Sequence, residues 1–314
     1  MAKKIGGSLQ EYRGRGCTWI HLGQADAAHL RELGARFTFH EHDLREVLPA
    51  LQHTKCILRP QYIFMVLLIP IYDQQRKLVR ESELDIFLNG DTLVTVNHGN
   101  ELSDVVALLD DMGNASRREL ILSQGPAEVI INLIDRLYKS TFPLLVQLSH
   151  EITDVEGRMF GEYERENTID EVLQLKTSNQ HARRAMMNHR NVLITLKGAL
   201  PRFVKVSAQH DHLDHIIQET TNIWNTLESQ RESVNTLHET NETLLSYRVN
   251  EIMKTLTIFA VIVFPLNLIA AIFGMNTVMG MPFLSDPNGF WVVLGLMFAG
   301  MLVMLAIFRG KKWL

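Results

Sequence analysis

Residues 256–273 read LTIFAVIVFPLNLIAAIF, a run of 18 residues without a charge. Residues 290–308 read FWVVLGLMFAGMLVMLAIF and add a second uncharged run of 19. The hydrocarbon core of a bilayer is about 30 Å thick, so a helix that rises about 1.5 Å per residue needs about 20 mainly apolar residues to cross it. Helices of soluble proteins usually keep a polar face, and the second run has none. The sequence therefore predicts two membrane spans, joined by a loop at residues 274–289.

Basic residues gather on one side of these spans. The tail at residues 309–314 reads RGKKWL, and Arg248 and Lys254 precede the first span. The loop between the spans has no basic residue and one acid, Asp286. Because cytoplasmic flanks of membrane helices are enriched in Lys and Arg, we expect both chain ends in the cytoplasm and the loop outside. The N-terminus has no apolar segment typical of a signal peptide, so residues 1–254 are expected to stay in the cytosol.

Composition excludes several classes of protein. The 314 residues are 46% hydrophobic and 21% charged, which is typical of a folded chain. No Lys- and Arg-rich run lies outside the tail, so the charge pattern predicts no nucleic-acid partner. The two cysteines, Cys17 and Cys56, are too few for a disulfide scaffold and indicate reduced thiols in the cytosol.

The cytosolic part divides into an α/β domain and a helical part. The hairpin signal Asn89-Gly90-Asp91 separates two β-rich segments, and helical segments are expected at 25–33, 43–51 and 102–110. The segments that favour strands are 17–22, 62–71, 84–88 and 92–97. We place the α/β domain at residues 1–125.

Residues 126–254 favour helix almost throughout and are expected to form a funnel or stalk. Pro143 is expected to interrupt the first helix. Residues 202–264 contain neither Gly nor Pro, and we expect one break, near residues 207–211. What remains predicts one helix that continues from the cytosol into the transmembrane module at residues 255–314.

One face of that long helix is small or polar where lipid contact would require large apolar side chains. Steps of four and three residues place these positions on one face. One interpretation is tight helix packing through small residues, with Asn267 hydrogen-bonding between helices. The other is a pore, which one two-span chain cannot enclose but several copies around an axis can. The positions are Ser246, Asn250, Met253, Thr257, Ala260, Phe264, Asn267 and Ala271.

The first span runs into Phe273-Gly274-Met275-Asn276. Gly274 is expected to end the helix in the left-handed conformation, which would place Asn276 at the mouth of such a pore.

Several short motifs surround the first span. They are NEIMKTLT at residues 250–257, FPL at 264–266, the Gly-Met-Asn tripeptide at 274–276, Met-Pro in the loop and the terminal KKWL. In these motifs the sequence resembles CorA-type divalent-cation channels. Upstream, the segments 43–48, 62–69, 86–96 and 133–156 also resemble the cytosolic domain of the family, so the resemblance covers nearly the whole chain.

The resemblance implies a homopentamer with α/β domains, a helical funnel and a pore lined by five copies of the first span. It implies a selectivity filter at Gly274, Met275 and Asn276 that receives the hydrated ion, and a hydrophobic gate at Met253 and Leu256. The cargo would be Mg²⁺, with Co²⁺ and Ni²⁺ as related ions, and no other cofactor is expected. The pore-lining positions are Asn250, Met253, Leu256, Thr257, Ala260, Phe264 and Asn267.

The family also implies a regulatory metal site between neighbouring subunits. Glu46 matches one acidic position of that site, and its partner aligns with either Asp211 or His215. Independently, the sequence HDHLDH at residues 210–215 places His212 and His215 at i, i+3, where they could bind Zn²⁺ together with Asp211 or Asp214. The alternative is a solvated charged surface.

Three residues depart from the family pattern and leave the metal open. Asn267 stands where Thr is usual, Phe264 where Met is usual, and Phe283 where an acid usually follows Met-Pro. A ZntB-like zinc transporter is therefore the alternative, although such relatives usually replace the methionine of Gly-Met-Asn. A membrane-tethered metal sensor or metal-dependent hydrolase is a remote alternative, because the sequence has no nucleophile elbow, P-loop or HExxH motif. We expect a non-enzymatic, homo-oligomeric transporter in the bilayer of the inner (cell) membrane.

Overall fold

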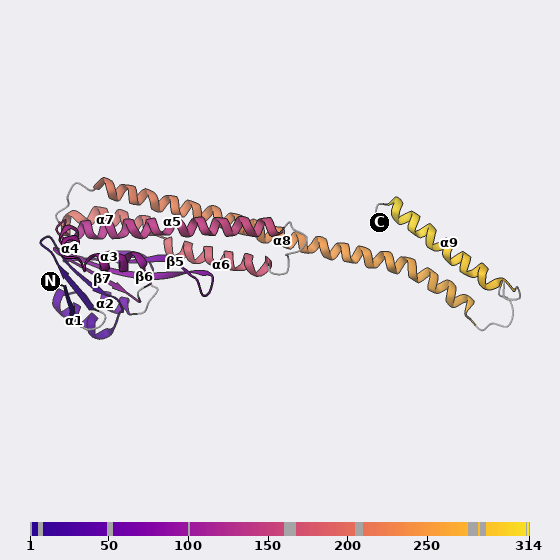
Figure 1. Ribbon diagram of the computed structural model, residues 1–314, viewed down its shortest axis with the longest axis horizontal. Coiled ribbons are helices and arrows are strands. Elements are labelled where there is room, and N and C mark those ends of the chain that lie inside the picture. Colours follow the sequence, from indigo (N-terminus) through magenta and orange to yellow (C-terminus); the bar gives the residue numbers. More distant parts are fainter. Residues whose placement is uncertain are drawn as a thin grey trace. The chain divides into compact units, whose positions relative to one another are not determined.

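The computed structural model describes residues 2–5, 9–48, 53–99, 101–159, 168–204, 210–275, 282, 287–311 and 313. The chain forms two compact units, Met1–His238 and Glu239–Leu314. The first unit contains a β-sheet covered by helices, and the second contains two helical segments near the C-terminus (Figure 1).

A seven-stranded sheet forms the centre of the first unit, in the order β1-β2-β3-β7-β6-β5-β4. β3 and β7 pair in parallel, and every other neighbouring pair is antiparallel. The four predicted strands are confirmed as β3, β5, β6 and β7, while β1, β2 and β4 escaped sequence analysis. The strands are β1 Ala2–Ile5, β2 Leu9–Arg13, β3 Thr18–Leu22, β4 Lys55–Leu58, β5 Ile63–Asp73, β6 Leu78–Asn89 and β7 Thr92–Asn97.

The predicted hairpin turn lies between β6 and β7. Asn89 pairs with Thr92, and Gly90 has φ +49°, a conformation that favours glycine. This turn fixes which residues of β6 lie opposite which residues of β7. The polar cluster described below depends on that register.

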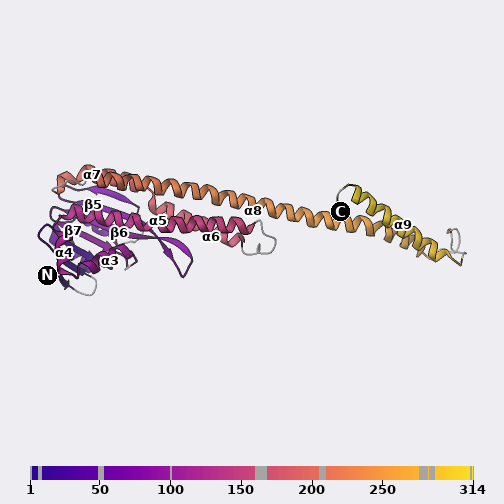
Figure 2. The same cartoon turned by 45° about the horizontal axis from the view of Figure 1, so that its top comes forward.

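Helices cover both faces of the sheet (Figures 1 and 2). Helices α1 (Ala27–Phe37) and α2 (Glu41–Val47) pack on one face through Leu30, Leu33 and Val47, against side chains such as Val66, Phe87 and Val96. The other face carries the larger core. Its helices include α3 Ser103–Asp111, α4 Ala115–Leu122, α5 Pro126–Met159, α6 Thr168–Met186 and α7 His189–Phe203.

The expected interruption at Pro143 is wrong. Helix α5 continues through Pro143 as one helix of 34 residues. Its face toward the sheet is a long apolar stripe, with Ile130, Leu137 and Leu148 all buried. The stripe continues on both sides of the proline, so packing stabilises the helix across the missing hydrogen bond.

A break precedes the long helix. Helix α7 ends at Phe203, Val204 is extended, and α8 begins at His210. Of the expected break at residues 207–211, residues 207–209 lie outside the described part and residues 210 and 211 already belong to α8. Helix α8 then runs without interruption to Phe273, through Pro265. A break that the sequence did not predict separates α6 from α7, where Asn188 adopts φ +70°.

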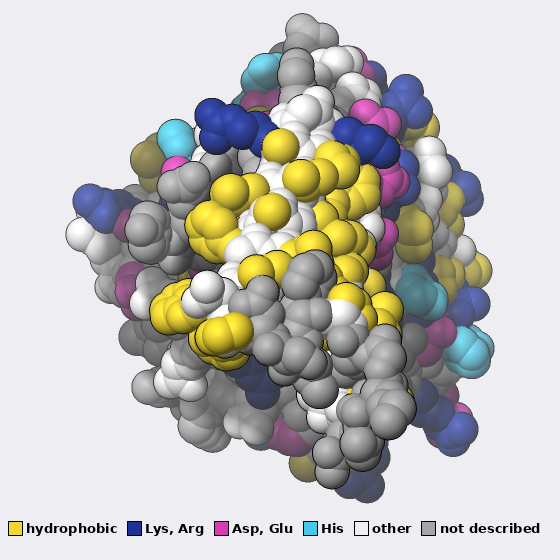
Figure 3. Space-filling model, turned by 90° about the vertical axis from the view of Figure 1, so that its right-hand side faces the viewer, with side chains coloured by type: hydrophobic (Ala, Val, Ile, Leu, Met, Phe, Trp, Pro, Cys, Tyr) yellow, Lys and Arg dark blue, Asp and Glu magenta, His cyan; other side chains and the backbone are white. Residues whose placement is uncertain are grey.

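The second unit contains the end of α8 and the helix α9 (Gly289–Gly310), and both pass the length and composition test for crossing a membrane. Their most apolar windows are 6% and 0% buried within one chain, unlike the core helix of a soluble protein, which is mostly buried. Hydrophobic side chains cover much of the described surface of this unit in Figure 3. The expected fold class, an α/β domain with a long helix and two C-terminal apolar helices, is confirmed.

The proposed boundaries at residues 125 and 254 remain a prediction. Helix α5 begins at Pro126, whereas α8 continues through residue 254.

Candidate functional site

The candidate pore residues lie on one face of α8. Met253 is 54% exposed, Leu256 60% and Phe264 71%. In a folded soluble protein, neighbouring large apolar side chains such as these are usually buried. Asn250, Thr257 and Asn267 are also exposed, and Ala260 is half-buried. Within one chain, most of this face is exposed among the residues that the structure describes.

The opposite face of the same helix is more buried. Ile258 is 9% exposed, and Ile262, Ile269 and Phe273 are half-buried. At 100° per residue these positions lie across the helix from Thr257 and its companions. The candidate pore face of α8 is therefore more exposed than the face opposite to it.

Thr257 shows how a hydroxyl group in this face is oriented. Its Oγ1 donates a hydrogen bond to the backbone carbonyl of Met253 at 2.7 Å. A hydroxyl has one donor and two acceptor lone pairs, so the proton is used within the helix and the oxygen remains an acceptor. Water around a divalent cation presents hydrogens outward. An acceptor on this face therefore suits a hydrated cation.

Helix α8 does not end through a left-handed glycine. Gly274 is absent from the described residues with positive φ, and its amide donates to the carbonyl of Ala270 at 2.9 Å. Met275 then donates to Ile272 at 3.3 Å, which tightens the last turn. The expected conformation was wrong because the last carbonyls find partners in successive turns. Asn276 and Asp286 lie outside the described residues.

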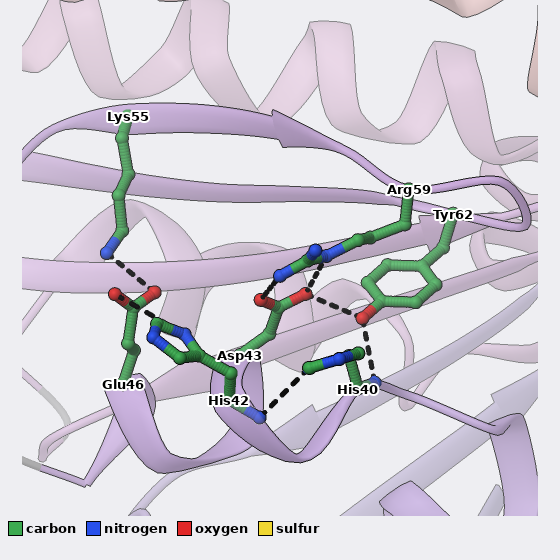
Figure 4. A network of polar contacts seen from close by, with 7 residues as sticks. All are labelled: His40, His42, Asp43, Glu46, Lys55, Arg59 and Tyr62. Carbon is green, nitrogen blue, oxygen red and sulfur yellow. Dashed lines mark hydrogen bonds and ion pairs between the residues drawn. The ribbon is translucent and has the colours of Figure 1, made fainter.

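Glu46, the predicted regulatory acid, lies on α2 and already has partners (Figure 4). Its carboxylate lies 2.7 Å from Lys55 Nζ and 3.8 Å from His42 Nδ1. A metal ion at Glu46 therefore has to compete with the ammonium group of Lys55.

The adjacent carboxylate of Asp43 is fully buried and held by three contacts (Figure 4). Arg59 binds both of its oxygens, with Nε 2.9 Å from Oδ2, and the hydroxyl of Tyr62 donates at 2.6 Å. Although burial alone would raise the pKa of Asp43, the donors Arg59 and Tyr62 lower it overall. This pair joins α2 to the segment between β4 and β5.

The other predicted regulatory residues lie at the start of α8 and point to separate partners. Asp214 lies 2.6 Å from Lys197 Nζ, His215 Nε2 lies 3.2 Å from Glu219, and His212 Nε2 lies 3.7 Å from Asp135 on α5. The side chain of Asp211 lies outside the described part. One chain thus does not bring these residues together with Glu46.

The structure reveals a cluster that the sequence analysis missed. Glu83 and Asp85 on β6 meet His98, which follows β7, with one ligand atom from each within 4.8 Å of the others. The signal in the sequence was the acid at every second position of β6, at residues 81, 83 and 85 of LVRESELDIFLN, because alternate residues of a strand lie on one face of the sheet.

Comparison with known proteins assigns the family. The chain is 30% identical over 303 residues to the cobalt/magnesium transport protein CorA of Thermotoga maritima, which covers 95% of this chain and 83% of the relative. The complete structure of the CorA magnesium transporter from Methanocaldococcus jannaschii matches with a TM-score of 0.80 at 20% identity, over 95% of this chain and 92% of that one.

A further structural likeness concerns the fold alone. The cytoplasmic domain of ZntB from Vibrio parahaemolyticus matches with a TM-score of 0.60 at 10% identity, over 77% of this chain and 99% of that domain.

The family model described as "CorA-like Mg2+ transporter protein" matches residues 14–312. Its members are transporters, which agrees with the expectation of a non-enzymatic chain. The protein therefore belongs to the CorA-like family of divalent-cation transporters.

Proposed function

We propose that this chain is one subunit of a homopentameric, channel-like pore that conducts Mg²⁺ across the cell membrane into the cytoplasm. The observation that carries the proposal is the exposed face of α8, which is small or polar at most positions inside an apolar span. It leads to Gly274-Met275-Asn276, the tripeptide that the family resemblance assigns to the filter. A single chain leaves this face uncovered, and a ring of chains would turn it toward a common axis.

Neutral acceptors suit Mg²⁺ because the ion gives up its water reluctantly. A ring of Asn276 amide oxygens would accept hydrogen bonds from the hydrated ion without removing the water. Thr257 and Asn267 would provide further acceptors along the span. Met253 and Leu256 would form a hydrophobic constriction that closes the pore by excluding water.

The membrane potential supplies the driving force. One charge gains about 2.3 kcal/mol per 100 mV, so a divalent cation gains about 4.6 kcal/mol when the cytoplasm is negative. This agrees with the orientation inferred from the basic flanks, with both chain ends in the cytoplasm. No ATP-binding motif was found in the sequence, and passive conduction requires none.

Regulation would use Glu46 with Asp211 or His215 of a neighbouring subunit. Lys55 now neutralises Glu46 within the chain. A cytosolic divalent cation would displace Lys55 and join two subunits, which would hold the pore closed when the ion is abundant.

The test is ion uptake into liposomes that contain the purified chain, with Mg²⁺ and Zn²⁺ compared by selective dyes. We expect Mg²⁺ entry that does not depend on a pH gradient, and no entry with Asn276→Ala, while that variant retains the oligomeric mass of the native protein. Full transport by Asn276→Ala would refute the assignment of the filter. Zn²⁺ entry without Mg²⁺ would instead support the ZntB-like alternative.

A further inference from the structure

A buried charged cluster lies on the sheet face that α1 and α2 cover. Asp85 pairs across the sheet with Val66 and Val96, and both valines belong to the apolar core on this face. Glu83 lies two residues earlier on β6 and therefore on the same face. Because Leu84 pairs with Asn97, the register places His98 beside Glu83.

The distances in this cluster are too long for good hydrogen bonds. Nε2 of His98 lies 3.4 Å from Oε1 of Glu83 and 3.5 Å from Oδ2 of Asp85. Ordinary N–H···O hydrogen bonds measure about 2.7–3.2 Å. In a tetrahedral site with metal–ligand bonds of about 2.1 Å, neighbouring ligand atoms are about 3.4 Å apart. The distances from Nε2 of His98 to Oε1 of Glu83 and to Oδ2 of Asp85 therefore both match the spacing of neighbouring ligand atoms around one ion.

Asp85 lacks the close donors that a buried carboxylate normally has. Its side chain is 0% exposed, neither oxygen meets the geometry of a hydrogen bond in the described part of the chain, and its ion-pair contact is Nε2 of His98 at 3.5 Å. Two buried carboxylates side by side, with a histidine nitrogen facing both, provide a place where a positive charge such as a metal ion is stabilised.

The acidic cluster on α2 gives a comparison, because basic and hydroxyl side chains of the protein occupy the positions around its carboxylates. There, Arg59 and Tyr62 donate to Asp43, and Lys55 contacts Glu46 at 2.7 Å. Asp85 has no such arginine or lysine within ion-pair distance among the described residues. The difference is therefore in the partners and not in the burial, since Asp43 is also 0% exposed.

We propose that Glu83, Asp85 and His98 form a binding site for one Zn²⁺ ion in the α/β part of the chain. Two carboxylates and a neutral imidazole give a charge-neutral complex with a divalent ion, and a water molecule would complete the tetrahedron. The imidazole nitrogen favours zinc, or cobalt as its spectroscopic substitute, over Mg²⁺, which prefers oxygen ligands in an octahedron.

The ion would reach the site from the side of His98. The side chain of His98 is 19% exposed, whereas the carboxylates of Glu83 and Asp85 are 0% exposed. Rotation of the imidazole therefore opens the cluster to solvent while the acids stay in place. The site is independent of the proposed pore, since none of its ligands lies on α8.

The experiment measures zinc retained by the purified full-length protein. The protein is loaded with Zn²⁺ and dialysed against zinc-free buffer with excess Mg²⁺, which fills oxygen-rich sites, and the metal is counted by mass spectrometry. We expect Asp85→Asn and His98→Gln each to lose one Zn²⁺ per chain, with an affinity at least about 10-fold weaker than that of the native protein. Circular dichroism confirms that each variant is folded.

Glu81→Gln is the matched control. Glu81 lies on the same strand, but its carboxylate lies 3.0 Å from Nδ1 of His181, a normal hydrogen bond, and it should retain the zinc. Co²⁺ in place of Zn²⁺ should give the visible absorption of a tetrahedral site in the native protein and lose it in Asp85→Asn. Equal zinc in the native protein and both ligand variants would overturn the proposal, as would a native chain that retains none. Asn276→Ala should retain the ion, which separates this test from that of the pore.

Discussion

His189 is a buried side chain whose protonation state bears on the stability of the whole α/β part. It is 0% exposed, with Nδ1 2.7 Å from the hydroxyl of Tyr138 and Nε2 3.3 Å from Oγ1 of Thr54. Burial lowers the pKa of His189 to about 4 from its ordinary 6.5. The imidazole is therefore neutral in the folded protein at pH 7.

The sign of the pH dependence follows from this depressed pKa. Between pH 6.5 and 4 the unfolded chain binds a proton at His189 that the folded chain rejects, so stability is present above pH 6.5 and falls as the pH drops to 4. The contribution is up to about 3 kcal/mol. We expect the melting temperature of full-length protein to fall more steeply from pH 7 to pH 5 than that of His189→Gln. Parallel melting curves for the two proteins would contradict this.

Single residues also show what sequence reasoning can and cannot find. The Gly-Met-Asn tripeptide was visible because its residues are contiguous. The pairing of Glu46 with Lys55, nine residues later, depends on where β4 passes α2. The cluster of Glu83, Asp85 and His98 depends on a strand register that only the folded sheet fixes. Contacts between residues on different elements thus cannot be predicted from a sequence pattern until the positions of those elements are known.

At the scale of elements, Arg59 fastens α2 to the sheet. Removing it leaves the buried carboxylate of Asp43 with Tyr62 as the remaining side-chain donor among the described residues. Breaking one partner of a buried pair typically costs about 3–5 kcal/mol, because the remaining charge has no compensation. We therefore expect Arg59→Ala to lower the free energy of unfolding by that amount, measured by chemical denaturation.

Arg45 on α2 supplies the matched control for Arg59. It pairs with Glu41 one turn earlier, and both side chains are 76% exposed. Exposed pairs contribute about 0–1 kcal/mol because water and salt screen them. Arg45→Ala should therefore leave the unfolding free energy within about 1 kcal/mol of the native value. Similar losses from the two variants would mean that burial of Asp43 does not matter.

The two threonines near the start of the apolar part of α8 test which face lines the pore. Thr257 lies on the polar face, and Thr255 lies about 160° around the helix. Both donate to a backbone carbonyl one turn earlier, at 2.7 and 2.9 Å, and both are exposed, so valine should perturb the helix equally. We expect Thr257→Val, which removes one acceptor from each subunit, to reduce Mg²⁺ flux about 10-fold, and Thr255→Val to leave the flux unchanged. The reverse order would place the pore on the other face.

Elements were predictable where one local signal was strong. The two apolar helices followed from composition and the β6–β7 turn from Asn-Gly, and the structure confirms both. Pro143 misled because proline predicts a break only when tertiary packing does not compensate for it. Strands β1, β2 and β4 were missed because AKKI, LQEYR and KCIL are short and carry charged residues, whereas β3 (TWIHL), which has the same length as β2, was found from its aromatic and β-branched residues. Their stability comes from neighbours in the sheet and not from their own sequence.

At the scale of the whole molecule, the proposed pore requires several chains, and this changes how a defective chain acts. If each chain conducted alone, mixing native and Asn276→Ala chains in equal amounts would halve the flux. In a ring of five, every pore shares one filter, and only about 3% of randomly assembled rings contain five native chains. Flux should therefore fall well below one half when the two chains are co-expressed in equal amounts.

Graded mixtures make this measurement a test of subunit number. If one alanine in the ring is enough to block the filter, flux follows the fifth power of the native fraction, whereas a dimer would follow its square and retain about 25% at equal mixing. The mass of the detergent-solubilised assembly, corrected for bound detergent, gives an independent count and should equal five chains. A linear fall in flux with the native fraction would contradict the shared filter, because each native chain would then contribute to the flux independently of its neighbours.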